Sequence, residues 1–168
     1  DEVDCGDEGL VCHTGLGCSP CHPMSRFCEG QTVVECQGNG ITTVPLAECL
    51  PEHNEVCYLG NCRDACQAAA DDRSYVGCEY WTVDLDQYTD PFTNPKPDEV
   101  PHSVVISNPN NKTATIAFYS QVVGASVNVA DPTVPANSVK AFTMPRLDIS
   151  GTGVTKNAIN IVSSIPVS

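Results

Sequence analysis

The sequence predicts a mainly β protein, with a small disulfide-rich N-terminal module followed by an antiparallel β-sandwich and one short helix near residues 64–72. Three observations carry this prediction. All 11 cysteines lie between Cys5 and Cys78, in a segment with almost no periodic apolar pattern. Residues 103–168 hold short apolar stretches punctuated by Pro, Asn and Gly about every 10 to 15 residues, which is typical of a sandwich. Residues 62–73 are Ala-rich without β-branched residues, which favours a helix.

The cysteines indicate an exported protein. Their spacing is irregular rather than arranged in the paired knuckles of zinc sites, which favours disulfides formed in an oxidising compartment. A module this small buries too little apolar surface to fold unaided, so disulfides are expected to replace a core. Because 11 is an odd number, one thiol is free, intermolecular or otherwise engaged. The chain starts at Asp1 without a signal segment, as in a mature exported protein or a trimmed piece.

Charge is distributed unevenly along the chain. Residues 1–100 carry 19 acidic and 4 basic side chains, whereas residues 101–168 carry 2 acidic and 4 basic ones. An acidic surface of this size repels nucleic acid and anionic lipid, so no nucleic-acid partner is expected. No apolar stretch reaches the length of a membrane span, so no transmembrane segment is expected either.

The first half is expected to contain one hairpin, one helix and one strand. Residues 32–36 and 41–44 are β-branched and flank a Gly- and Asn-containing turn, which predicts the hairpin. The helix follows near 64–72, and the aromatic and β-branched residues 75–85 predict a strand. We place the domain boundary between residues 66 and 67, with the disulfide-rich acidic module at 1–66 and the sandwich at 67–168.

Five further strands are expected in the second domain, at residues 103–107, 113–119, 124–130, 138–144 and 158–163. Period-2 patterning assigns two pairs of residues to the core: Ile116 with Phe118, and Val127 with Val129. Residues 165–168 have the pattern of the start of another strand. Either the chain is trimmed there, or a strand from a neighbouring molecule completes the sandwich and builds a polymer.

One motif resembles a known family. The stretch Ser-Tyr-Val-Gly-Cys-Glu-Tyr-Trp-Thr-Val-Asp-Leu-Asp at residues 74–86 resembles the bacterial secreted branch of the IgGFc-binding-protein N-terminal-like family, although Gln87 replaces the family's following Asn. The likeness extends more weakly over residues 28–168. It implies a secreted or surface-displayed module for adhesion, binding or structure, and it maps no catalytic residue onto this chain.

A second motif points to redox chemistry. Cys18, Cys21 and His22 have the spacing of a c-type haem attachment site, in which two thioethers and one axial histidine hold the haem. The candidates for the second axial ligand are His13, Met24 and His53. This hypothesis makes the protein a mono-haem c-type cytochrome for extracellular electron transfer. The competing interpretation places both cysteines in disulfides.

Calcium is a second candidate cofactor. Asp84, Asp86 and Asp90 offer carboxylate oxygens at a strand end and its loop. In the alternative interpretation, Asp84 and Asp86 face solvent while Val83 and Leu85 pack inward. No spacing typical of a hydrolase, a P-loop or a dinucleotide site occurs, so no catalytic residues are assigned.

The sequence therefore predicts a secreted or surface-displayed, non-enzymatic protein for binding or adhesion, or one that forms fibres. Its expected partners are a protein or a glycan at the cell surface, including self-association into a polymer. We also expect Cys66 and Cys78 to form a disulfide, because they lie at the two ends of the short segment that contains most of the predicted helix.

Overall fold

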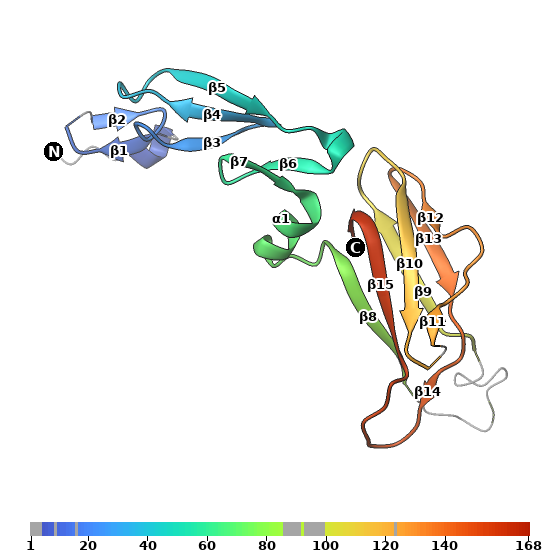
Figure 1. Cartoon of the computed structure of the whole chain (residues 1–168). Helices are drawn as coiled ribbons and strands as arrows, with labels where there is room; N and C mark the ends of the chain where they lie inside the picture. Colours follow the sequence, from blue (N-terminus) through green and yellow to red (C-terminus); the bar gives the residue numbers. More distant parts are fainter. Residues whose placement is uncertain (1–4, 9, 16, 86–91, 93–99, 123) are drawn as a thin grey trace. The chain divides into compact units, whose positions relative to one another are not determined.

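The computed structural model describes residues 5–8, 10–15, 17–85, 92, 100–122 and 124–168 (Figure 1). The chain is mainly β and disulfide-rich, which confirms the predicted fold class, and the described residues form one α-helix, α1 (Ala65–Asp72). Two compact units divide the chain, Asp1–Ala68 and Ala69–Ser168. The division falls inside α1, close to the boundary expected from the distribution of cysteines.

Unit 1 consists of short antiparallel strands. They form a hairpin β1-β2, a three-stranded sheet β3-β4-β5 and a hairpin β6-β7. The strands are β1 (Val11–His13), β2 (Gly17–Ser19), β3 (Arg26–Glu29), β4 (Thr32–Cys36), β5 (Thr43–Glu48), β6 (Glu55–Tyr58) and β7 (Asn61–Asp64). Two short 3-10 helices, η1 (Cys5–Glu8) and η2 (Pro51–His53), lie among them.

The predicted hairpin is present as β4 and β5, but its second strand begins two residues later than expected. The Asn39 side-chain oxygen accepts hydrogen bonds from the backbone N–H groups of Ile41 and Thr42, at 3.0 and 3.1 Å. Bonds of this kind hold the backbone in a turn and compete with strand pairing. Ile41 and Thr42 therefore belong to the turn, and β5 starts at Thr43.

Disulfides make up much of the interior of unit 1. Four pairs are Cys5–Cys18, Cys21–Cys36, Cys28–Cys57 and Cys49–Cys62. Cys66 and Cys78 are disulfide-bonded as well, and Cys12 is the free, exposed cysteine. Cys36 and Cys49 are fully buried, at 0% exposure, so sulfur occupies positions that larger apolar side chains fill in an ordinary core.

Unit 2 is a β-sandwich of one large and one small sheet (Figure 1). The large sheet has the order β11-β10-β15-β8-β14, with β12 also paired to β10, and the small sheet is β13-β9. The strands are β8 (Gly77–Leu85), β9 (Ser103–Asn108), β10 (Ala114–Ser120), β11 (Ala125–Ser126), β12 (Thr133–Val134), β13 (Ser138–Thr143), β14 (Asp148–Ile149) and β15 (Ala158–Val167).

The apolar core of unit 2 lies between these two sheets. Ile116 and Phe118 of β10 are each 2% exposed, as their alternation predicts, and the Phe118 ring packs on that of Phe142 with centroids 5.2 Å apart. The other buried members are Ile106, Ala114, Val134, Met144, Ile159, Ile161, Ile165 and Val167. The core therefore combines residues from β9, β10, β12, β13 and β15.

The predicted strand at 124–130 is mostly absent, although its two valines pack against the core. Only β11 pairs with β10, and Val127 adds one bond from its N–H to the Phe118 carbonyl, at 2.7 Å. Farther along β10, its edge pairs with β12, and the Ile116 N–H donates to the Pro132 carbonyl at 2.8 Å. Since two short strands share one edge of β10, the residues between them form a loop. Val127 and Val129 are partly buried against the core from that loop.

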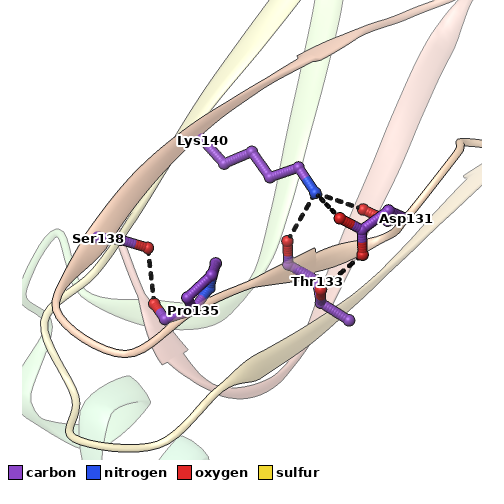
Figure 2. A network of polar contacts seen from close by, with 5 residues as sticks. All are labelled: Asp131, Thr133, Pro135, Ser138 and Lys140. Atoms are coloured by element: carbon purple, nitrogen blue, oxygen red, sulfur yellow. Dashed lines mark hydrogen bonds and ion pairs between the residues drawn. The ribbon is translucent and has the colours of Figure 1, made fainter.

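A cluster of polar contacts holds the turn before β12 (Figure 2). The Lys140 ammonium donates to the carboxylate and carbonyl oxygens of Asp131, both at 2.6 Å, and to the Thr133 carbonyl at 3.0 Å. The Thr133 hydroxyl donates to the second carboxylate oxygen of Asp131 at 2.7 Å. Hydrogen bonds from Lys140 and Thr133, together with the lysine charge, lower the pKa of Asp131. These contacts connect β13 of the small sheet to the turn that leads into β12.

The last residues do not begin a new strand, so that expectation is wrong. β15 runs without a break through Val167, with an irregularity in its pairing to β8 between Val162 and Val167. Ile165 and Val167 are 3% and 1% exposed, because they continue the inward-facing row of β15. Beyond them, the backbone of Ser168 exchanges two hydrogen bonds with Ser107 of β9, at 2.7 and 3.0 Å. This end of β15 therefore adjoins the small sheet.

Candidate functional site: an open side of the sandwich

One edge of the small sheet is unpaired over part of its length. β9 pairs with β13 on one side, and on the other side Ser107 pairs with Ser168. Backbone N–H and C=O groups of alternate residues in an antiparallel strand point the same way. The backbone N–H and C=O groups of Ser103 and Val105 therefore also point away from β13. Among the described residues, no strand pairs with them on that side.

The facing strand of the large sheet is also open. β8 pairs with β15 along one side, but its pairing with β14 on the other covers only Asp84 and Leu85. Residues 77–83 of β8 thus have a strand neighbour on one side only, within the described part of the chain. In the part of the chain that the structure describes, the sandwich is therefore open on the side between β8 and β9.

An apolar groove of about 170 Å³ lies on this open side. Its walls come from β8, β9 and β15, and include Tyr80, Thr82, Val104, Ile106, Ile161 and Val167. Apolar walls with a few convergent polar groups are the usual chemistry of a binding site. The groove therefore combines an apolar floor with the unpaired backbone donors and acceptors of Ser103 and Val105.

Hydrogen bonds fix three polar side chains, two that line the groove and one beside it. The Thr82 hydroxyl and the His102 Nε2 atom are 2.9 Å apart, which joins β8 to the residue before β9. The Nδ1 atom of His102 is buried and has no hydrogen-bond partner among the described residues. The Tyr80 hydroxyl donates to the Val167 carbonyl and lies 3.1 Å from that of Tyr75. Burial raises the pKa of Tyr80, opposed by a hydrogen bond with the Gly77 backbone.

The outer face of the large sheet carries a separate row of aromatic and amide side chains. Tyr119 of β10, Asn160 of β15 and Trp81 of β8 are directly opposite one another across three adjacent strands. Trp81 is 62% exposed and Tyr119 is 46% exposed. The Asn160 amide is oriented by donating to the Glu79 carboxylate at 3.0 Å and to the Tyr80 carbonyl at 3.3 Å.

This row borders a shallow hollow of about 420 Å³ that Ser120, Gln121 and Gly124 also line. Neither the row nor the groove was identified from the sequence. Trp81 is the single tryptophan of the chain, but its partners come from strands about 40 and 80 positions away in the sequence. Only the register of the strands brings them together.

The calcium hypothesis is only partly covered by the described residues. Asp84 is half-buried near the end of β8, whereas Asp86 and Asp90 lie outside the described residues. The alternative interpretation, in which Val83 and Leu85 pack inward, is wrong, since they are 43% and 60% exposed. Tyr80 and Thr82 face the small sheet, so alternation along β8 turns Val83 and Leu85 to the opposite side.

The haem hypothesis and the disulfide arrangement exclude each other. Cys18 is bonded to Cys5, and Cys21 is bonded to Cys36. A thioether bond to haem needs each of these sulfurs, and a sulfur in a disulfide cannot form it. The remaining predicted ligands lie in different surroundings. His22 is exposed in a turn, His13 is half-buried in β1, Met24 is 71% exposed, and His53 is exposed in η2.

Comparison with family models, curated proteins and solved structures finds no match to this chain. The resemblance to the IgGFc-binding-protein N-terminal-like family thus stays a prediction. Among the described residues, no helix is long and apolar enough to cross a membrane. The disulfides fit an oxidising compartment.

Proposed function

We propose that the chain is a non-enzymatic binding module of an exported protein, and that it binds an extended segment of a partner protein by strand addition along β9. The observation that carries this proposal is the outer edge of β9, which among the described residues is unpaired at Ser103 and Val105 and lies beside an apolar groove. Strand addition uses both features at once, because backbone hydrogen bonds supply affinity while pockets for alternate side chains supply specificity.

The geometry defines what the partner segment offers. An added strand would pair with the N–H and C=O groups of Ser103 and Val105, in line with the pair already made by Ser107 and Ser168. Every second side chain of that strand would point into the groove between Tyr80, Val104 and Ile161. The expected ligand is therefore an extended peptide with apolar residues at alternate positions. A segment of this kind on a second copy of the chain would give a fibre.

The experiment is a selection of phage-displayed random ten-residue peptides on the immobilised full chain, followed by binding measurements on two variants. Val105→Pro removes the outward N–H of β9 without removing a bond to β13. Val139→Pro is the matched control. Val139 is opposite Ser107, so its backbone N–H points away from β9, on the side of β13 that is remote from the groove edge. The two valines are 63% and 64% exposed.

We expect enriched peptides with alternating apolar residues that bind the control variant as they bind the unchanged chain. Binding to Val105→Pro should fall at least tenfold, because one backbone donor is lost and the proline ring obstructs pairing. Selection without any enriched pattern, or equal loss in both proline variants, contradicts the proposal. Light scattering of the same proteins shows whether a second copy is the partner.

The aromatic row on the outer face favours a second candidate function, the binding of neutral glycans. Exposed aromatic rings pack against the apolar faces of sugar rings, while an oriented amide hydrogen-bonds sugar hydroxyls. Trp81, Tyr119 and Asn160 provide this combination at the hollow. Binding to a glycan array should disappear in Trp81→Ala and persist in Leu85→Ala, whose residue is similarly exposed on β8 but lies outside the row. Unchanged binding in Trp81→Ala contradicts this candidate.

A further inference from the structure

Three sulfur atoms of unit 1 form a cluster that contains a single disulfide. Cys12 on β1 is directly opposite Cys18 on β2, and Cys18 is bonded to Cys5. Their Sγ atoms all lie within 4.8 Å of one another. The cluster lines a hollow of about 360 Å³ together with His13, Thr14 and Gly17. One free thiol is thus held beside a disulfide that it can attack.

The backbone geometry accepts more than one pairing of these sulfurs. Directly opposed residues of antiparallel strands have Cα atoms about 4.5 to 5.5 Å apart. Disulfides form across Cα separations of about 4.4 to 6.8 Å. The pair Cys12–Cys18 falls in this range through its register alone, as does Cys5–Cys18 with a Cα separation of 5.3 Å. No rearrangement of β1 and β2 is needed to change from one pair to the other.

We propose that Cys5, Cys12 and Cys18 form a thiol–disulfide exchange site. In the internal step, the Cys12 thiolate attacks the Sγ atom of Cys18, so that a Cys12–Cys18 bond forms and the Cys5–Cys18 bond breaks. The electron pair of the broken bond leaves on the Cys5 sulfur, which then takes a proton. One disulfide and one thiol are present before and after this step, so it needs no oxidant or reductant.

The three sulfur atoms differ in how accessible they are to a partner in solvent. Cys5 is 3% exposed, whereas Cys12 is exposed. Cys12 is therefore the sulfur that meets an external disulfide. Its thiolate attacks one sulfur of that disulfide, forms a mixed disulfide at Cys12, and releases the other half as a thiolate. The chemical class of partner is a disulfide-bonded small molecule or protein of an oxidising compartment. This proposal is independent of the groove and of the aromatic row.

Three single variants of the full chain test the internal step. Each is expressed with export to an oxidising compartment, denatured and treated with iodoacetamide, and its alkyl groups are counted by mass spectrometry. Cys5→Ser should form Cys12–Cys18, Cys18→Ser should form Cys5–Cys12, and Cys12→Ser should keep Cys5–Cys18. All three should take up no alkyl group. Two alkyl groups on both Cys5→Ser and Cys18→Ser, with Cys12→Ser unlabelled, overturn the proposal.

The external step is tested on the unchanged chain, which does not depend on the folding of any variant. Oxidised glutathione at pH 8 should add one glutathione, because the thiolate is the reactive form and alkaline pH favours it. Cleavage after Glu8 and Leu16 separates the three cysteines, so peptide mapping locates the adduct at Cys12. Cys12→Ser should take up none. An unmodified wild-type chain, or an equal adduct on Cys12→Ser, overturns the proposal.

Discussion

Units 1 and 2 are both β structures, but different forces hold them. The buried apolar residues of unit 1 are four disulfide cysteines, Val33, Val34 and two alanines. In unit 2 the buried cluster has 11 apolar residues and contains no cysteine. A chain held by several disulfides needs no large core because the bonds restrict its unfolded state. The sheet pair of unit 2, in which Cys78 is the only cysteine and is disulfide-bonded, relies on apolar burial instead. Each unit should therefore unfold under a different perturbation.

Reduction of the disulfides should give the largest difference in stability between the two units. With the disulfides reduced and alkylated, unit 1 should unfold, since closing the loops of Cys21–Cys36 and Cys28–Cys57 stabilises the folded unit by about 3–4 kcal/mol each. Unit 2 should keep its fold. Hydrogen exchange followed by mass spectrometry measures this as lost protection in β3 and β4 and retained protection in β10 and β15. Simultaneous loss in both units would show that they depend on each other.

Truncation of the core should have the converse effect. Phe118→Ala should lower the free energy of unfolding of unit 2 by about 3–5 kcal/mol, through lost burial and the cavity left against Phe142. Unit 1 should keep its protection in the same hydrogen-exchange experiment. Val44→Ala on exposed β5 is the control, and its effect should stay within about 0.5 kcal/mol. An equal effect of the two variants on unit 2 would contradict a core centred on Phe118.

A single buried amide tests how far unit 2 depends on polar contacts. Asn108 is 1% exposed, and its Nδ2 atom lies within 3.0 Å of the carbonyl oxygens of Lys112, Val134 and Pro135. Asn108→Ala leaves these acceptors without their donor, so urea unfolding of unit 2 should show a loss of about 1–3 kcal/mol. Asn128→Ala at an exposed position is the comparison and should change little. A neutral Asn108→Ala would mean that water replaces the amide.

The Lys140 cluster should give the smallest effect, because Asp131 is exposed (Figure 2). Lys140→Met should raise the pKa of Asp131 toward its ordinary value, which carboxyl NMR titration measures. Since folding lowers this pKa, the stabilisation is present above the unfolded-state pKa and is lost as pH falls through the folded value. The variant should lose that acid-side pH dependence of unit 2 stability. An unshifted Asp131 would show that Thr133 alone holds the carboxylate.

Local patterns were sufficient to predict several elements. The Ala-rich segment predicted α1, and alternation predicted the buried faces of Ile116 and Phe118. Patterns misled where a tertiary contact competed with them. Asn39 extended the turn before β5, and β12 took the part of the β10 edge that a longer strand after Gly124 would have used. The haem hypothesis depends on the spacing of Cys18, Cys21 and His22 alone, whereas the disulfides of Cys18 to Cys5 and of Cys21 to Cys36 join residues 13 and 15 positions apart.

The sequence by itself determined the mainly β class, the concentration of disulfides in the first unit and the alternation of core positions, because composition and short-range periodicity are local properties. Tertiary structure alone decided which cysteine is free, which strand edge is unpaired and which residues share a face. These depend on contacts between distant residues, such as Trp81 with Asn160 and Ser107 with Ser168. Strand register and disulfide pairing have no local signal, so the groove, the aromatic row and the three-sulfur cluster emerged only from the folded chain.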